Sequence, residues 1–113
     1  MGPYQDPMVF LNAQRVGLAK AITMQIYAIG ASEMQGTTRG RPRAARARQI
    51  AVHLARSVFA LSHGQLAVEF GRDRSTISHA CNLIDRLRAQ DGEFDSTLRW
   101  MEAHLRRVTG IAP

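Results

Sequence analysis

The sequence predicts an all-α fold, a small domain of about five to six helices. Apolar residues recur at spacings of three and four in several long segments, as they do on the buried face of a helix. No segment alternates apolar and polar residues for long enough to indicate a strand, and glycines stand where the periodic segments end. A length of 113 residues limits the chain to one domain with a modest core.

The N-terminal segment, residues 1–9, holds two prolines and a glycine without periodicity, and we expect it to be a flexible arm. Residues 10–110 are then expected to form the single helical domain. Its first helix is predicted over about residues 11–29, with Asn12 as the N-terminal cap and Gly30 as the stop. The expected buried stripe of that helix consists of Leu11, Leu18, Ile22, Ile26 and Ile29.

A short helical turn is expected over residues 32–35, followed by a loop, Gly36–Pro42, that is rich in glycine, threonine and arginine. The second long helix is predicted over about Arg43–Phe59. Three of its arginines fall outside the apolar stripe and are expected at the surface. The stripe itself consists of Ala47, Ile50, Ala51, Leu54, Ala55 and Val58.

A helix-turn-helix is predicted over about residues 63–89. Ser62 is expected to cap a short helix over residues 63–70, Gly71 makes the turn, and a second helix follows over about residues 74–89. The last helix, about residues 93–108, is expected to bury residues spaced by four, three, four and three, with Trp100 and the methionines in the core or at its rim. Those residues are Phe94, Leu98, Met101, Leu105 and Val108.

The chain is strongly basic, with a formal net charge of +6 carried by fourteen arginines and the single Lys20. Arginine favours two-pronged recognition of phosphate and guanine, although a genome rich in arginine codons would also explain part of the surplus. Cys81 has no partner for an internal disulfide, no signal peptide is evident, and no apolar stretch is long enough to span a bilayer. We therefore expect a cytoplasmic, nucleoid-associated protein that does not bind a membrane.

The start of the second helix of the helix-turn-helix carries the side chains expected to read DNA. Arg72 and Arg74 flank Asp73, and short hydroxyl residues follow. Arg74 is placed to reach guanine, Asp73 to accept from cytosine, and Ser75 and Thr76 to contact phosphate or a thymine methyl group. Asp73 is equally well placed to cap the helix, with the flanking arginines merely solvated.

The segment from Arg39 to Arg48 holds five arginines and no acidic residue. Arg39, Arg41 and Arg43 are expected on a loop that enters a narrow minor groove, where the negative potential is enhanced. Arg46 and Arg48 begin a helix and are expected to hold phosphates. A solvated basic linker is the alternative. Together with the helix-turn-helix, this segment indicates double-stranded DNA as the partner.

Other chemistry finds little support in the sequence. His79 and Cys81 lie two residues apart on different helical faces and no second cysteine exists, so we expect no metal site and treat Cys81 as a small buried hydrophobic residue. Gly71–Thr76 lacks the lysine and the glycine spacing of a phosphate-binding loop. We therefore expect no cofactor, and the absence of any converging acid pair or nucleophile–base pair predicts that the protein is not an enzyme.

Two blocks of sequence, Ala47–Arg56 and Phe70–Cys81, together with Leu61-Ser62 between them, resemble the C-terminal DNA-binding domain of the bacterial replication initiator DnaA. The resemblance extends from about Ile22 to Leu87. It implies an all-helical domain whose helix-turn-helix reads the major groove of a nine-base-pair box, while an arginine of the preceding basic loop reads the minor groove.

Carried over to this chain, the resemblance puts Asp73, Arg74 and Ser75 at base-reading positions and Thr76 and His79 near the backbone. Arg39, Arg41 or Arg43 would supply the minor-groove contact. The chain departs from the family where one glycine rather than two precedes Arg72, where Arg74 replaces a histidine, and where Asn82 and Leu83 replace basic residues. The ATPase and self-assembly domains of the initiator are not in this sequence, so a stand-alone protein is expected.

The leading hypothesis is a DnaA-related protein that regulates replication initiation or transcription by sequence-specific binding to double-stranded DNA. The alternative is an adaptor that contacts the replication initiator, or the machinery that inactivates it, through the same fold. Asn82 and Leu83 on an otherwise basic face, and the apolar stripe of the last helix, favour the adaptor. Retention of protein partners after nuclease treatment distinguishes the two.

Overall fold

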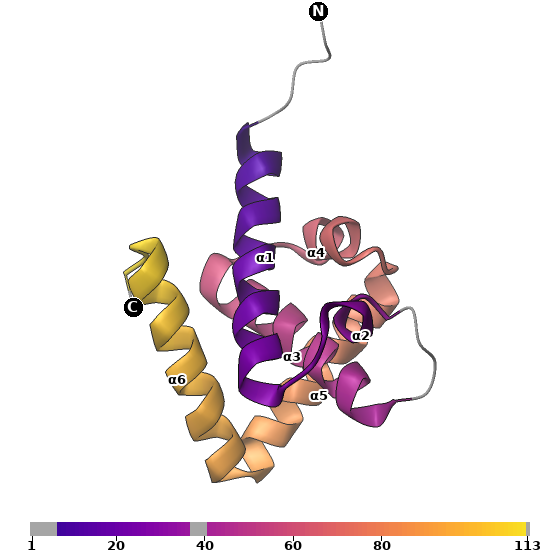
Figure 1. Cartoon of the computed structure of the whole chain (residues 1–113), viewed down its shortest axis with the longest axis vertical. Helices are drawn as coiled ribbons and strands as arrows, with labels where there is room; N and C mark the ends of the chain where they lie inside the picture. The colour runs from indigo at the N-terminus through magenta and orange to yellow at the C-terminus, as the bar shows by residue number, and fades with distance from the viewer. Residues whose placement is uncertain (1–6, 37–40, 113) are drawn as a thin grey trace, which may run out of the picture.

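The computed structural model describes residues 7–36 and 41–112, and within these ranges the chain forms six helices and no strand (Figure 1). The predicted all-α fold is confirmed. The order of the helices is α1 (Pro7–Tyr27), α2 (Ala31–Gln35), α3 (Pro42–Phe59), α4 (His63–Phe70), α5 (Arg74–Gln90) and α6 (Gly92–Thr109).

Helix α3 is the centre of the molecule and packs against each of the other five helices. Its stripe is largely of small residues, and Ala47, Ala51 and Ala55 are fully buried, which lets neighbouring helices approach closely. Ile50 and Leu54 fill the remaining space between α1, α5 and α6. The buried stripe predicted for this helix is therefore confirmed, and the structure also buries Ala44, Val52, His53 and Phe59.

The first helix differs from the sequence-based expectation at both ends. Helix α1 begins at Pro7, so residues 7–9 of the expected flexible arm are helical, whereas residues 1–6 lie outside the described part of the chain. Asn12 is therefore inside the helix and is not its cap. The helix ends at Tyr27 rather than at Gly30, because Ala28 takes a left-handed conformation with φ of 54° and Gly30 caps α2.

The buried stripe predicted for α1 is confirmed only in part: Ile22 and Ile29 are buried and Leu11 is half-buried, but two of its residues are exposed. Helix α1 packs against α3 through Asn12, Val16, Ala19, Ile22 and Thr23, while Leu18 and Ile26 remain 41% and 42% exposed. The hydroxyl of Thr23 donates to the carbonyl of Ala19 at 2.8 Å, so this polar side chain is buried with its hydrogen bond made inside its own helix. Ala19 and Thr23 are buried because small side chains allow α1 to approach α3 closely.

The last helix matches its predicted stripe except at the C-terminal end. Leu98, Met101 and Leu105 are fully buried and Phe94 is half-buried, as predicted. Val108, in contrast, is 56% exposed, because the chain turns at Gly110 and brings Ile111 onto the core instead. The prediction for Trp100 was wrong as well, since this side chain is exposed and stacks on His104.

A polar network joins α3, α5 and α6 at the edge of the core. Arg88 donates through Nε to Asp95 at 2.6 Å and through Nη2 to Glu102 at 2.9 Å. Its Nη1 lies 3.0 Å from Nε2 of His53, and because arginine can only donate, Nε2 must accept. The Nδ1 of His53 lies 3.5 Å from Asp85. His53 is therefore buried as a neutral ring that bridges a cation and a carboxylate.

Burial lowers the pKa of His53, and the nearby Arg88 lowers it further, against the opposite influence of Asp85 and Glu102. A histidine whose pKa is lower in the folded state is protonated more readily in the unfolded state. The stability that it contributes is therefore present above the unfolded pKa of about 6.5 and is lost as the pH falls below it.

We expect the Tm to fall as the pH drops from about 7 to about 5.5, a window above that in which carboxylates titrate. The substitution His53→Gln keeps an acceptor for Arg88 and should flatten this dependence, as measured by thermal unfolding followed by circular dichroism. His79→Gln changes an exposed histidine and should leave the slope intact. An equal slope in all three proteins would contradict the role of His53.

Candidate nucleic-acid interface

The turn between α4 and α5 depends on a single glycine. Gly71 has φ of 61°, a left-handed conformation that costs other residues free energy. Around it, the amide of Arg72 donates to the carbonyl of Ala67 at 3.1 Å and the amide of Gly71 donates to Val68 at 3.3 Å, which closes α4. The start of α4 is fixed by a capping box between Ser62 and Gln65. Local chemistry thus sets the length of α4 and the direction in which the chain enters α5.

Asp73 caps the helix that follows. Its Oδ1 accepts from the amide of Thr76 and from the hydroxyl of Ser75, both at 2.8 Å. The hydrogen bond from the Thr76 amide and those from the side chains of Ser75 and Thr76 lower the pKa of Asp73. Of the two roles that the sequence left open for Asp73, the structure gives Oδ1 to the cap.

The first turns of α5 are open to solvent. Arg72, Asp73, Arg74, Ser75, Thr76 and His79 are all exposed. The guanidinium of Arg74 lies over Gly64 at the start of α4, so close that a Cβ at Gly64 would stand 2.8 Å from Nη2. The N-terminus of a helix offers no partner for a cation. Among the described residues no ion pair holds Arg74, which lies at the tip of the helix-turn-helix.

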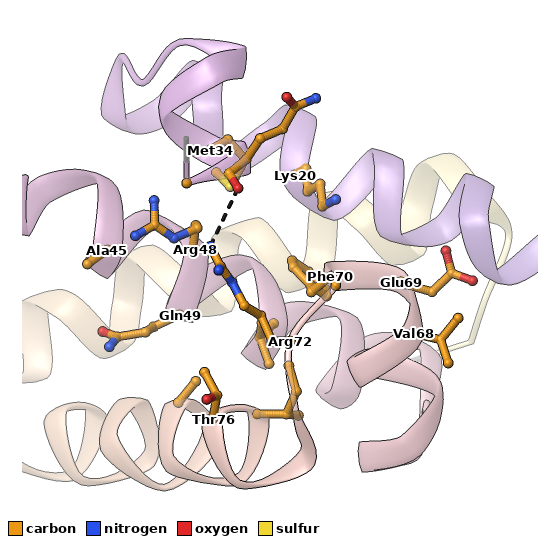
Figure 2. Close-up of a pocket in the computed structure, with 16 residues that line it drawn as sticks. Lys20, Met34, Ala45, Arg48, Gln49, Val68, Glu69, Phe70, Arg72 and Thr76 are labelled. Carbon is orange, nitrogen blue, oxygen red and sulfur yellow. Dashed lines mark hydrogen bonds between the residues drawn. The ribbon is translucent and has the colours of Figure 1, made fainter. Parts of the chain in front are cut away.

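Arg72 and Arg48 point to the same place, the C-terminal end of α2. Arg48 donates through Nη1 to the carbonyl of Glu33 at 2.7 Å, and Arg72 donates through Nη2 to the carbonyl of Gln35 at 3.4 Å, the bond dashed in Figure 2. A Cβ added at Gly36, whose φ is 78°, would collide with the guanidinium of Arg72. The two arginines thus connect α2 to α3 and to the helix-turn-helix.

These two arginines border an open pocket of about 670 Å³ between α2, α3 and the helix-turn-helix (Figure 2). Burial lowers the pKa of Arg48, and the neighbouring guanidinium of Arg72 lowers it further. Their hydrogen-bond partners at α2 are carbonyl oxygens, which carry only partial negative charge. The pocket therefore holds two adjacent cations whose repulsion an anion would relieve.

The other predicted basic residues do not all converge on this pocket. Arg43 donates to the carbonyl of Tyr27 at 2.6 Å and borders a separate hollow next to the end of α1. Arg46 borders the same hollow, and its Nε donates to Gln49. Arg41 is 69% exposed and lies 3.8 Å from Glu33. Arg39 lies outside the described residues. The structure thus divides the basic segment between two sides of α3.

The structure adds two residues that the sequence did not single out. Lys20 from α1 and Gln49 from α3 border the same pocket as Arg48 and Arg72. Burial lowers the pKa of Lys20, against the raising influence of Glu69, and its ammonium lies 4.7 Å from the ring centre of Phe70. No local motif marks either residue, because only the packing of α1 and α3 against α4 brings them to the pocket.

Two further features bear on the kind of site. Within residues 7–36 and 41–112, no group of three or more histidine, cysteine or acidic side chains could hold a metal ion. No helix in the same ranges is long and apolar enough to cross a membrane.

Leu83, which the adaptor hypothesis uses as an apolar contact, is half-buried, while Asn82 beside it is exposed.

Comparison with known proteins identifies the fold. Residues 19–84 match the family described as the bacterial DnaA protein helix-turn-helix. The chain belongs to this family. The matched DnaA region contains α2, α3 and α4 entirely and ends inside α5, so it includes the capped turn and every residue that borders the pocket.

Relatives in the same family carry the name chromosomal replication initiator protein DnaA. The chain is 36% identical over 73 residues to the protein of Sphingopyxis alaskensis, a match that covers 64% of this chain and 16% of that protein. It is 38% identical over 85 residues to the protein of Acinetobacter baumannii strain AYE, covering 74% and 17% respectively. The chain thus spans about a sixth of the length of these DnaA proteins.

Two substitutions at Asp73 distinguish the effect of its capping hydrogen bond from the effect of its negative charge. Asp73→Ala removes the acceptor for the Thr76 amide and should lower both the Tm and the helix content, whereas Asp73→Asn retains an amide oxygen and should keep most of both. Because the pKa of Asp73 is lowered, its contribution in the wild type should persist down to about pH 4 and be lost only as the pH falls further. Thermal unfolding at neutral pH measures the difference. An Asp73→Ala protein as stable as the wild type would contradict the cap.

Proposed function

We propose that this protein binds double-stranded DNA in a sequence-specific manner and thereby regulates the initiation of chromosome replication or transcription. The observation that carries the proposal is the exposed N-terminal end of α5, with Arg74 at its tip and a pocket bordered by cations beside it. The exposed end of a helix with polar side chains fits the major groove, where each base pair presents a distinct pattern.

The arrangement supports a division of labour along the duplex. Arg74 and Ser75 are proposed to contact base edges, and Asp73 to hold the helix end that presents them. Arg72, Arg48, Arg46, Thr76 and His79 are proposed to contact the backbone, where guanidinium and hydroxyl groups fix the register of a protein on DNA. Arg39, Arg41 and Arg43 remain proposed minor-groove contacts, although Arg43 is used at the end of α1.

The proposed link to replication rests on family membership. The relatives are named as chromosomal replication initiators, but this chain corresponds to about a sixth of their length. We therefore propose that the shared segment contributes site recognition to replication control, with sites related to those that DnaA proteins bind. Binding to such a box, compared with a scrambled duplex of equal composition at physiological salt, tests this part of the proposal.

The affinity for duplex DNA is expected to depend steeply on the salt concentration. If about six phosphates are neutralised, the affinity for duplex DNA should drop by roughly a thousandfold between 50 and 200 mM salt, because bound counterions are released on binding. Fluorescence anisotropy with a labelled duplex measures the slope. A flat response to salt, or no binding at 50 mM, would contradict DNA binding through phosphates.

The base preference of the site is expected to depend on Arg74 at the tip of α5. Arg74→Ala should reduce the preference at one base pair by roughly 1–3 kcal/mol while changing binding to unrelated sequences much less. Arg107→Ala removes an exposed arginine from α6 and is the matched control, with the same change in net charge. Competition titrations with single-base variants of the site measure the preference. Equal losses on every sequence after Arg74→Ala would remove its role in base recognition.

A further inference from the structure

The pocket between α2, α3 and the helix-turn-helix has a basic end and an apolar end (Figure 2). The side chains of Arg48 and Arg72 lie at the basic end. Phe70 and Val68 lie toward the other end, and Val68 is 76% exposed. The volume of about 670 Å³ is typical of pockets that hold a small molecule and far exceeds that of one tetrahedral oxyanion.

The two cations of the basic end lie against the same residue. A Cβ added at Gly36 would collide with the guanidinium of Arg72 and would stand 3.4 Å from Cζ of Arg48. Burial lowers the pKa of Arg48, and the charge of Arg72 lowers it further. No ion pair within residues 7–36 and 41–112 holds either arginine. The fold therefore keeps two like charges together without a carboxylate to offset them.

The acidic residue of the pocket lies at the apolar end. Glu69 is the one acidic side chain among the described residues that border the pocket. Burial lowers the pKa of Lys20, and the charge of Glu69 opposes this change. The ammonium of Lys20 is 4.7 Å from the centre of the Phe70 ring, so Lys20 and Glu69 largely offset each other at that end. The charge that remains without a counter-charge is that of the two arginines.

Charge and shape together indicate which anion suits the basic end. A guanidinium is a planar fork that binds two oxygen atoms of a phosphate. A terminal phosphate carries about two negative charges at neutral pH, whereas each phosphate diester of DNA carries about one. Two adjacent guanidiniums therefore match a terminal phosphate in both charge and number of oxygen atoms.

We infer that the pocket binds a soluble ligand that ends in a diphosphate group, with the terminal phosphate between Arg48 and Arg72 and the rest of the ligand directed toward Phe70. Gln49 also borders the pocket, and its Oε1 accepts from Nε of Arg46 at 3.2 Å. The Nε2 of Gln49 is therefore the atom that it offers to the second phosphate. Inorganic pyrophosphate and nucleoside diphosphates share this chemistry, and a nucleoside adds an apolar surface that the wall at Phe70 can cover.

Such a ligand would regulate the interface in which the pocket lies. Arg48 and Arg72 are proposed contacts of the DNA backbone, and this part of the inference rests on the proposed function. A diphosphate bound between the two arginines removes both of them from the duplex, so the ligand and the DNA should compete. At about ten times its own Kd, the ligand should weaken the binding of duplex DNA by about tenfold.

Calorimetric titration of the DNA-free protein at constant ionic strength tests the ligand class. Inorganic pyrophosphate should bind at least about tenfold more tightly than sulfate, which is a single dianionic tetrahedral group. Equal affinities for the two anions, or no binding of pyrophosphate, would overturn the inference. ADP distinguishes the two sources of the diphosphate: tighter binding than that of pyrophosphate identifies a nucleotide, and equal or weaker binding identifies the inorganic ligand.

Substitutions test where pyrophosphate binds. Arg72→Ala should weaken its binding at least about tenfold, whereas Arg107→Ala, which changes the net charge equally at an exposed position of α6, should alter it less than about twofold. Arg48→Lys keeps the charge but loses the fork and should also weaken binding. Circular dichroism checks that each variant is folded. Equal losses in Arg72→Ala and Arg107→Ala would show that only net charge matters and would overturn the inference.

Competition separates this inference from the proposed function. Fluorescence anisotropy of a labelled duplex is followed as pyrophosphate is added, with sulfate at the same ionic strength as the control. Release of the duplex by pyrophosphate but not by sulfate is the expected result. A duplex that stays bound at saturating pyrophosphate would overturn the inference while DNA binding stands. A protein that binds pyrophosphate through Arg72 but binds no duplex would contradict the proposed function and leave the diphosphate site in place.

Discussion

The whole fold depends on the burial of α3. Its alanines let α1 and α5 approach closely, and every other helix takes its place from contact with it. Close packing of small residues leaves little freedom in how the neighbours are set, because a protein interior is as dense as an organic crystal. The position of α5, and so of its exposed tip, follows from Ile77, Ala80 and Ile84 seated on this central helix.

Polar interactions between the helices add to the packing of the core and fix the relative positions of the helices. Arg88 joins α5 to α6 through carboxylates and to α3 through a neutral histidine, while Arg48 and Arg72 join α2 to its neighbours through carbonyl oxygens. The difference matters. Arg88 is neutralised by Asp95 and Glu102, so it serves the fold. Arg48 and Arg72 keep their charge largely uncompensated, which suits a surface that meets an anion.

How far the sequence predicts this structure depends on how local the deciding interactions are. The helix-turn-helix was predicted well because the capping hydrogen bonds of Ser62, Gly71 and Asp73 reach residues at most four positions away. The buried face of α1 was predicted only in part, because the larger apolar residues Leu18 and Ile26 stay exposed while the smaller Ala19 and Thr23 pack against α3. The partners of Arg48 and Arg72 lie 15 and 37 residues away, beyond any local pattern.

The error at α1 carries information of its own. An amphipathic pattern that is read as a core stripe but remains partly exposed shows that α1 has more apolar surface than one neighbour can cover, and burying that surface is favourable wherever a second surface is available. The charges of the molecule are concentrated on other helices, so α1 and the tip of α5 use opposite chemistry.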